Sequence, residues 1–410
     1  MRTSLQDNSL SISFKTEPFF LIIYCLILMN FYNASVYISY SLVPFAILAF
    51  KKNPHLFDYN IFFIFLFSFL YSLVLLVKGS DRSLPLVLGY FFFPPVFYFL
   101  GKLYISKYPS TTTVYYLLFF TCLLFSILPF ISNLLSFFEN GFMQNRNIRM
   151  FWMQGDTAKA ATQVGSYFAF SMAMLPLIFI KKAWAEERTL SFLALGLFLA
   201  ALFSILNMSN RTGLLIMVVG FLVFIIIPKE NRFWHSLLAA GFLLLVGILY
   251  ETDTLSIKSW FEYSKLHDRI TGTSVDEEGS RIVIWKANLT NLIHYPFGYA
   301  SLHSLSSYAH NLWLDVGRAT GIIPLIPLVV FTTTSIYKYG KFIFSLKFGA
   351  FLRFIIAAFG TAFFITFSLE PIMEGYFIMF LLYCFYFGIL TGCDKYLNIY
   401  PRSSNISQSI

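Results

Sequence analysis

Long apolar runs constrain this chain more than any other feature. Residues 59–77 and 189–208, for example, contain no charged side chain. A run of about 20 apolar residues is long enough to cross the roughly 30 Å hydrocarbon core of a bilayer as a helix. Helices are required there because lipid offers no partners for free backbone groups. The runs therefore predict an all-α, polytopic membrane protein.

The composition agrees with this prediction. Of the 410 residues, 58% are hydrophobic and only 12% are charged, which is about half the charged fraction of a typical soluble domain. We expect about twelve transmembrane helices, with one large outside loop between the ninth and the tenth. The expected helices lie near residues 17–33, 36–50, 59–77, 84–104, 113–137, 164–180, 189–208, 212–228, 233–250, 311–335, 349–369 and 376–392.

These helices divide the chain into four parts. Residues 1–250 hold the first nine helices, with a smaller outside loop near 138–163. Residues 251–310 form the large loop, residues 311–392 hold the last three helices, and residues 393–410 form a tail. A loop as long as the second part is usually either functional or disordered, so it is the first place to search for a site.

Basic residues predict the orientation of the chain. The formal net charge is +9, and each short loop on one side carries at least two Lys or Arg residues, as in the segments KKNP, KKAWAEER and PKENR. Cytoplasmic loops carry such an excess. We therefore expect both termini in the cytoplasm and the 251–310 loop on the opposite face. Topology accounts for the positive charge, and no interleaved basic and aromatic groove indicates a nucleic acid partner.

One stretch of the large loop has helical periodicity. Ile282, Trp285, Leu289 and Leu292 recur at spacings of three, four and three residues. This spacing places them on one face of a helix. We expect an amphipathic helix near 281–293 that lies on the outer surface of the membrane.

The motifs of soluble enzymes are absent from the sequence. It has no GxxxxGK[ST] phosphate loop, no HExxH zinc site, no Gly-x-Ser-x-Gly elbow and no Cys-x-x-Cys pair. No carboxylate cluster has the spacing of a metal site, so no metal or other cofactor is expected. Polar residues at the outer ends of helices remain as candidates. Among them, Glu370 and Glu374 lie between the last two helices, where a solvated turn is the simpler explanation.

Two arginines are the strongest candidates. Arg211 follows a Ser-Asn pair in a very short turn. Ionisable groups near membrane depth often mark substrate paths, although snorkelling to the interface is the simpler alternative. Arg281 begins the expected amphipathic helix, close to Trp285, and is either a substrate contact or a solvated surface residue. Arg269 and Lys286 are weaker candidates of the same kind.

A histidine marks the entrance of the expected tenth helix. His310 and Asn311 come directly before its apolar residues. Histidine can accept a proton near neutral pH, and a position at the membrane interface is the simpler alternative. Asp315 lies within the same helix, and Arg318 follows three residues later on the same face. Two opposite charges cost less free energy at this depth when they form an ion pair. We therefore expect these two residues to pair.

Taken in order, these pieces resemble the O-antigen ligase and O-antigen polymerase superfamily. The resemblance consists of a Ser-Asn-Arg turn, a Ser-Arg-x-x-x-Trp segment, the Pro-x-Gly element in Tyr295–Gly298, and His-Asn followed by Gly321. It is firmest over residues 205–330, and the twelve-helix layout extends it over most of the chain. Two positions depart from the family pattern: Ala300 replaces a frequent second glycine, and residues 316–321 replace the usual Glu-Gly pair.

The resemblance implies a metal-independent glycosyl transfer on the periplasmic face of a bacterial inner membrane. The donor is a glycan on undecaprenyl diphosphate, the acceptor is a sugar hydroxyl, and a flippase and a chain-length regulator are the implied protein partners. Arg211 and Arg281 match the family's two key arginines, and His310 matches its histidine. Further substrate contacts are expected from Asn311, Trp285, Arg269, Lys286, Asp315 and Arg318.

Three functions are compatible with these observations. A polymerase transfers the glycan to the next lipid-linked repeat unit, whereas a ligase transfers it to the lipid A core. The Leu-Trp-Leu-Asp stretch after His-Asn favours the polymerase. A transporter or flippase for lipid-linked oligosaccharide is the alternative from another class. Transporters often show internal repeats, and the absence of a repeat here favours surface chemistry.

Overall fold

The computed structural model describes residues 13–79, 82–142, 147–153, 158–179, 188–227, 241, 281–298 and 308–397. The expected ninth helix near 233–250 lies outside this set apart from Gly241, as do residues 251–280 of the large loop and the tail beyond residue 397. The candidate Arg269 therefore lies outside the described residues.

Helices account for nearly all of the described chain. Its first part forms α1 (Ser13–Met29), α2 (Ser35–Ser39), α3 (Leu42–Lys52), α4 (Tyr59–Val77), α5 (Leu84–Lys107) and α6 (Thr111–Asn140). The later part forms α7 (Ala161–Ser166), α8 (Ala169–Ala173), α10 (Arg188–Asn207), α11 (Arg211–Ile226), α15 (Arg281–His294), α16 (Leu312–Thr320), α17 (Ile322–Phe344), α18 (Ala350–Leu369), α19 (Ile372–Gly375) and α20 (Phe377–Gly392). Short 3-10 segments occur at η2 (Phe31–Asn33), η3 (Pro54–Leu56) and η4 (Leu175–Phe179), and a π-helical turn at Cys393–Leu397 follows α20.

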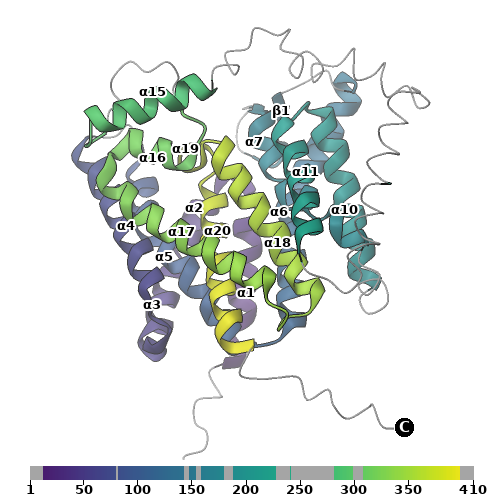
Figure 1. The fold of residues 1–410 in the computed structure, drawn as a ribbon, viewed down its shortest axis with the longest axis horizontal. Coiled ribbons are helices and arrows are strands. Elements are labelled where there is room, and N and C mark those ends of the chain that lie inside the picture. Colours follow the sequence, from purple (N-terminus) through teal and green to yellow (C-terminus); the bar gives the residue numbers. More distant parts are fainter. Residues whose placement is uncertain are drawn as a thin grey trace, which may run out of the picture.

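Seven helices within the described residues are long and apolar enough to cross a membrane. They are α4, α5, α6, α10, α17, α18 and α20 with the turn that follows it, and shorter apolar helices lie at Phe20–Met29 and in α11. The chain is thus an all-α, polytopic membrane protein. Helices α15, α16 and α19 lie together at one end of the molecule, the top of Figure 1, and α3 lies toward the opposite end. We call these the upper end and the lower end.

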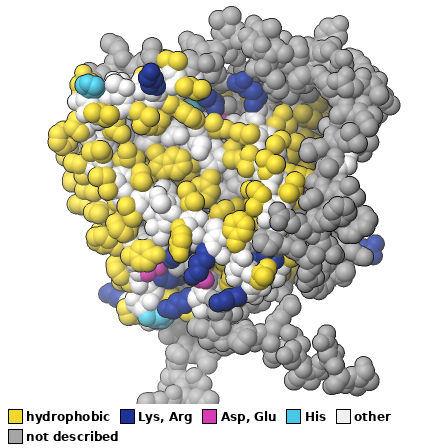
Figure 2. All heavy atoms as spheres, in the orientation of Figure 1, with side chains coloured by type: hydrophobic (Ala, Val, Ile, Leu, Met, Phe, Trp, Pro, Cys, Tyr) yellow, Lys and Arg dark blue, Asp and Glu magenta, His cyan; other side chains and the backbone are white. Residues whose placement is uncertain are grey.

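The surface has the polarity expected of a lipid-facing protein. Hydrophobic side chains cover much of the face drawn in Figure 2, and Lys and Arg side chains gather at its lower edge. Lys51, Lys52 and Lys341 are exposed residues of the lower end. Large apolar side chains such as Phe65 and Ile326 are exposed along the membrane-crossing helices. An apolar band between two polar ends is the pattern that a bilayer selects.

Helices α5 and α20 approach each other most closely through glycine. A Cβ atom added to Gly101 would lie 2.1 Å from the carbonyl oxygen of Phe385, and one added to Gly388 would lie 2.1 Å from that of Tyr98. Small residues allow helix backbones in membranes to come this near. The ring of Phe387 packs edge-on against Tyr98, with 5.5 Å between the ring centroids. This pair forms the centre of the helix bundle.

Three expected helices are broken in the structure, which corrects the sequence prediction. The helix expected at 36–50 divides into α2 and α3, and the one at 164–180 divides into α7, α8 and η4, which contains Pro176. Proline cannot continue the backbone hydrogen bonding of a helix. The helix expected at 311–335 divides into α16 and α17 at Gly321, which adopts a positive φ of 85°. Apolar composition alone does not encode such breaks.

The smaller loop contains a short antiparallel hairpin that no pattern in the sequence predicted. Strand β1 (Asn147–Arg149) pairs with β2 (Ala158–Ala160). Strands of three residues are too short for periodicity to reveal. The hairpin lies at the upper end beside α7 (Figure 1), and α7 begins directly after β2. It therefore connects the end of α6 to the upper part of the bundle.

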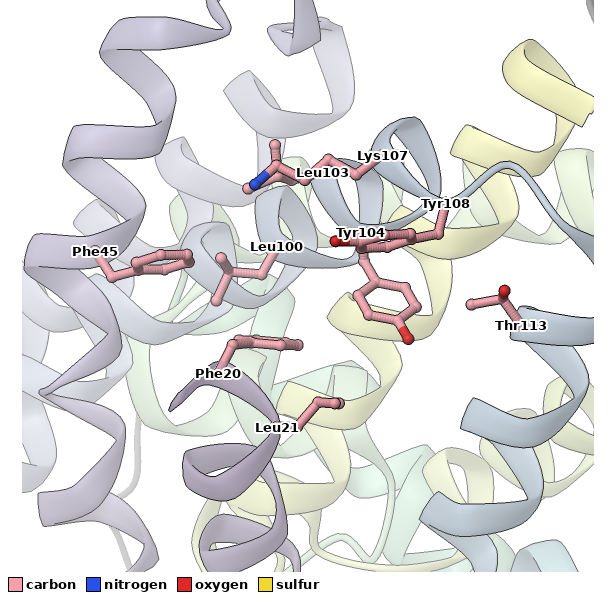
Figure 3. Close-up of a pocket in the computed structure, with 9 residues that line it drawn as sticks. All are labelled: Phe20, Leu21, Phe45, Leu100, Leu103, Tyr104, Lys107, Tyr108 and Thr113. Carbon is pink, nitrogen blue, oxygen red and sulfur yellow. The ribbon is translucent and has the colours of Figure 1, made fainter. Parts of the chain in front are cut away.

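An apolar pocket of about 270 Å³ lies between α1, α3, α5 and α6 (Figure 3). Lys107, the last residue of α5, is at its rim, and Phe20, Phe45 and Tyr104 supply aromatic walls. The 24 residues of α5 span about 36 Å. The pocket is therefore far from the polar residues of the upper end.

The contact between α5 and α20 predicts that a Gly→Ala substitution destabilises the protein at Gly101 but not at Gly340. Gly101→Ala should lower the thermal midpoint of the purified protein by several degrees, because its Cβ would meet backbone and overpacking costs about 1–3 kcal/mol. Gly340→Ala in α17 is the matched control, since a Cβ there meets nothing within 4 Å. Thermal unfolding in detergent measures both variants. Equal midpoints for the two would contradict the close packing.

Candidate functional site

Two turns of the same design position the candidate residues at the upper end. Ser209 and His310 both adopt left-handed backbone conformations, with φ of 54° and 53°. Each is followed by an asparagine that caps a helix: the side-chain oxygen of Asn210 accepts from the N–H of Gly213, and that of Asn311 accepts from the N–H of Leu314. Asparagine is among the preferred N-cap residues. The sequence therefore fixes where α11 and α16 begin.

Both asparagines also join their turns to other elements. The Asn210 amide nitrogen donates to the carbonyl oxygen of Ala161 at 2.8 Å, and that of Asn311 donates to the carbonyl oxygen of Ser368 at 3.3 Å. Left-handed conformations of residues other than glycine cost about 1–2 kcal/mol and persist where the surroundings enforce them. The caps and these interhelix bonds supply that enforcement.

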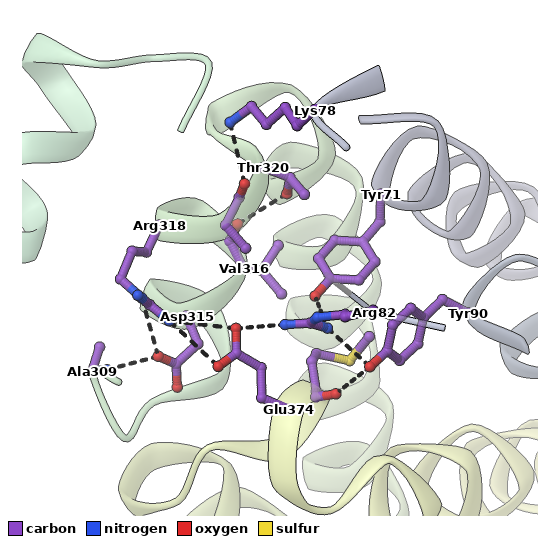
Figure 4. A network of polar contacts seen from close by, with 12 residues as sticks. Tyr71, Lys78, Arg82, Tyr90, Ala309, Asp315, Val316, Arg318, Thr320 and Glu374 are labelled. Atoms are coloured by element: carbon purple, nitrogen blue, oxygen red, sulfur yellow. Dashed lines mark hydrogen bonds and ion pairs between the residues drawn. The ribbon is translucent and has the colours of Figure 1, made fainter. Parts of the chain in front are cut away.

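Asp315 holds the backbone on both sides of His310. Its carboxylate accepts from the N–H of Ala309 at 2.7 Å and from the N–H of Asn311 at 3.1 Å. The indole of Trp285, on α15, donates to the carbonyl oxygen of Ala309 at 2.8 Å. Figure 4 shows Asp315 turned toward Ala309. Three candidate residues are thus brought together, and two of them position the third.

Burial makes the Asp315 carboxyl an unusually weak acid. The carboxylate is almost completely enclosed, and this desolvation raises its pKa from 3.8 to about 6, although its two backbone hydrogen bonds act in the opposite direction. Nearby Glu374 raises the pKa further, whereas Arg318 lowers it. Asp315 therefore titrates close to neutral pH.

An ionic network extends from Asp315 across the upper end (Figure 4). The expected pair with Arg318 is formed at 4.0 Å between Nε and Oδ1, but the Glu374 carboxylate lies nearer to that guanidinium, at 3.4 Å. Glu374 also pairs with Arg82 at 2.6 Å, and Arg82 donates to Tyr90 at 2.9 Å. The expectation that Glu374 lies in a solvated turn is wrong, because two cations from distant segments enclose it.

Arg211 and Arg281 line the same pocket, although they lie far apart in the sequence. The pocket has a volume of about 280 Å³ and lies between α7, α11, α15 and the end of α18. Thr212 also lines it and donates to Glu370 at 2.8 Å. Glu370 is fully buried, at 0% exposure, so its assignment to a solvated turn is also wrong. Its burial follows from the tertiary contact with α11.

The end of α18 connects the pocket to the histidine. Ser368 accepts the hydrogen bond from Asn311, Leu369 lines the pocket, and Glu370 accepts from Thr212. Ser368 therefore contacts the residue after His310, and Glu370 contacts the residue after Arg211. On the other side, Arg281 lies one helical turn before Trp285. His310 is thus linked to the arginine pocket through the neighbours that it shares with Arg211 and Arg281.

The Pro-x-Gly element packs against the break between α16 and α17. The N–H of Ile322 donates to the carbonyl oxygen of Pro296 at 2.8 Å. A Cβ on Gly321 would lie 2.1 Å from that same oxygen. Lys78 donates to the carbonyl oxygen of Ala319 at 3.2 Å. The Pro-x-Gly element and the segment around Gly321 thus contact each other. These contacts hold the C-terminal end of α16 in place.

Helix α15 forms over Arg281–His294, and the face that packs on the protein differs from the apolar face of the sequence pattern. Ile282 and Leu289 are 79% and 53% exposed, whereas Ile284, Asn288 and Leu292 are buried. The buried residues recur every four positions and include Leu292, which lies against Gly317 of α16. Both faces of α15 carry apolar residues, so the spacing alone could not select the packed one.

Lys286 projects from an exposed position on α15 and does not line the arginine pocket. Sequence reasoning missed Thr212, Arg82 and Tyr308, whose ring lies 5.7 Å below the guanidinium of Arg318 and 6.3 Å from the ring of His310. Thr212 and Tyr308 are close in sequence to Arg211 and His310, whereas no sequence signal indicated Arg82. Among the described residues, no group of three or more His, Cys, Asp or Glu side chains is arranged to hold a metal ion.

Comparison of the chain with models of known protein families finds no match, and comparison with curated proteins finds none.

The raised pKa of Asp315 predicts a specific pH dependence of stability. A carboxyl whose folded pKa lies above its unfolded value stabilises the fold fully at low pH and loses that contribution as pH rises through its folded pKa, here about 6. The thermal midpoint of the wild type should therefore fall more steeply than that of Asp315→Asn as pH rises from the unfolded pKa of 3.8 to the folded pKa of about 6. Scanning unfolding at several pH values measures this difference. Parallel curves would show that Asp315 does not titrate in this range.

Proposed function

We propose that this chain is a surface polysaccharide polymerase of the O-antigen type. It transfers a glycan from undecaprenyl diphosphate to a sugar hydroxyl of the next lipid-linked repeat unit, on the periplasmic face of a bacterial inner membrane. The observation that carries the proposal is that Arg211 and Arg281 line one pocket, while Asp315 and Trp285 hold the turn that carries His310 and the end of α18 contacts both that turn and the start of α11. Both termini are then cytoplasmic, and the upper end is periplasmic.

The arginines suit the leaving group. As the acceptor oxygen bonds to the anomeric carbon, the bond to the diphosphate oxygen breaks and negative charge grows on that oxygen. Guanidinium groups stabilise such charge through paired hydrogen bonds, and preorganised charges of this kind usually contribute most to catalysis. Two arginines in one pocket can hold both phosphates. The lipid diphosphate is already activated, so the transfer requires no nucleotide.

His310 is suited to the acceptor side. Its imidazole is half-buried, and its backbone is held by neighbours from three helices. We assign it contact with the acceptor hydroxyl or with the diphosphate; the hydroxyl proton leaves to the imidazole or to the departing phosphate oxygen. In either role His310 must be correctly placed, and Asp315 and Asn311 hold the turn that carries it.

The distribution of polar groups favours transfer over transport. The candidate residues of this proposal lie at the upper end, and the bundle below them is filled by large buried aromatic side chains, including Phe67, Phe93, Phe97, Phe125 and Tyr383. A transporter places its substrate site near the middle of the membrane. A transporter is therefore the weaker alternative.

The first test removes the charges of the site. His310→Ala, Arg211→Ala and Arg281→Ala should each lower the transfer rate about 10²–10³-fold, the usual effect of losing a preorganised contact. Arg188→Ala is the matched control, because Arg188 lies at the start of α10 against Phe192 and outside the pocket. Purified protein in nanodiscs with lipid-linked repeat units as donor and acceptor gives the rate by mass spectrometry. Rates within a few fold of the control would exclude these residues.

The second test separates polymerase from ligase in a deletion strain. Loss of a polymerase leaves the ligase able to add single repeat units, so gels of the lipopolysaccharide should show core plus one unit and no ladder. Loss of a ligase would instead leave bare core and accumulated lipid-linked polymer. That second outcome would make the chain a ligase and would retain the arginine pocket as its site.

A further inference from the structure

A second polar pocket opens at the upper end, beside the hairpin. Its volume is about 520 Å³, larger than that of the arginine pocket. The last turns of α6 form one wall, and β1 with the turn after it forms the other. The lining residues are Ser132, Leu135, Ser136, Glu139, Asn140, Asn147, Arg149, Met150, Phe151 and Met153.

The wall formed by β1 follows a strict alternation. Asn147, Arg149 and Phe151 are exposed and line the pocket, whereas Ile148, Met150 and Trp152 are buried. Successive side chains of an extended chain point to opposite faces. The three exposed residues therefore present an amide, a guanidinium and an aromatic ring to the same pocket.

Hydrogen bonds fix both walls in place. The N–H of Phe151 donates to the hydroxyl of Ser132 at 3.2 Å, which ties the turn after β1 to α6. The Asn140 amide nitrogen donates to the carbonyl oxygen of Ser136 at 3.1 Å, which holds that side chain along the end of α6. The phenyl ring of Phe151 nevertheless remains 52% exposed. The pocket is thus a formed surface with an exposed aromatic ring at its edge.

The chemistry of the lining fits a neutral, hydroxyl-rich ligand. Sugar hydroxyls both donate and accept, and the Glu139 carboxylate accepts, Arg149 donates, and Asn140 and Asn147 can do both. An exposed phenyl ring can stack on the C–H face of a pyranose. The opposite charges of Glu139 and Arg149 make the lining unsuited to an anionic lipid headgroup, which the carboxylate would repel.

The hairpin places this pocket next to the arginine pocket. Asn147 of β1 pairs with Ala160 of β2, and the next residues, Ala161 and Thr162, line the arginine pocket. One strand spacing of about 4.8 Å and one residue step of about 3.8 Å therefore separate the backbones of the two linings. A glycan whose first sugar is held at the arginine pocket can reach the second pocket within a few sugars.

We propose that the pocket of α6 and β1 is a carbohydrate-binding subsite that holds sugars of the lipid-linked glycan beyond the one undergoing transfer. This inference rests on the proposed transferase function. The subsite binds the glycan through its hydroxyl groups and its apolar sugar faces, and it requires neither the diphosphate nor the lipid.

The test measures binding of sugar alone. The probe is the oligosaccharide that mild acid releases from the surface polysaccharide of the source cells, free of lipid and phosphate. Saturation-transfer NMR with the full-length protein in nanodiscs should detect it, and Phe151→Ala should weaken its binding about tenfold, as expected for loss of a stacking residue. Phe138→Ala is the matched control, because Phe138 is 74% exposed at the same end of α6 and does not line the pocket.

A second variant guards against misfolding. Glu139 is exposed, so Glu139→Gln preserves shape and folding while it removes the charged acceptor, and it should also weaken binding. Equal binding by Phe151→Ala, Glu139→Gln and the control would overturn the proposal, as would wild-type protein that binds no oligosaccharide. Binding that is lost only when anionic phospholipid is added to the nanodisc would identify a headgroup site and overturn it as well.

The same samples separate this inference from the transferase proposal. His310→Ala should bind the oligosaccharide normally, because the histidine does not line the pocket. Wild-type protein that binds oligosaccharide but transfers no glycan would remove the transferase assignment and leave the carbohydrate site standing. Normal transfer with no difference between Phe151→Ala and Phe138→Ala in oligosaccharide binding would do the reverse.

Discussion

The hydrocarbon interior of a bilayer offers no hydrogen-bond partner to a peptide group, and this constraint orders the whole molecule. Regular helices cross the apolar band because they satisfy their own backbone. Irregular backbone is tolerated where water or fixed protein groups can form hydrogen bonds with its N–H and C=O groups. The left-handed residues Ser209 and His310, the break at Gly321 and the hairpin all lie at the upper end. The candidate site lies where several departures from regular helix meet, whereas the break between α8 and η4 is enclosed by other helices of the bundle.

At the upper end, two asparagines have the same two roles. Asn210 and Asn311 each cap a helix and each donate to a carbonyl oxygen of another element. A cap alone would fix only the start of a helix, and a bond to another element alone would leave the turn free to rotate. Because each amide does both, the turn that precedes it is fixed relative to the bundle. Arg211 and His310 acquire defined positions through these neighbours.

The sequence predicted what depends on local pattern and missed what depends on tertiary partners. Apolar runs in the sequence predicted most of the membrane-crossing helices. The order of short polar motifs indicated Arg211, Arg281 and His310 as candidates. The burial of Glu370 could not be predicted, because it follows from a bond to Thr212 across the bundle. The division of the tenth helix depends on a contact with Pro296, and no periodicity records that contact.

Two sets of charged residues lie at the upper end and differ in their composition. Arg82, Arg318, Glu374 and Asp315 form a network in which two cations face two carboxylates, so it adds little net field beyond its own contacts. Arg211 and Arg281 line the arginine pocket from two different helices, and Thr212 beside them donates to Glu370. The first set brings its cations and carboxylates together within the protein and can act as a scaffold. In the proposed function, the two guanidinium groups of the second set would contact the diphosphate of the donor.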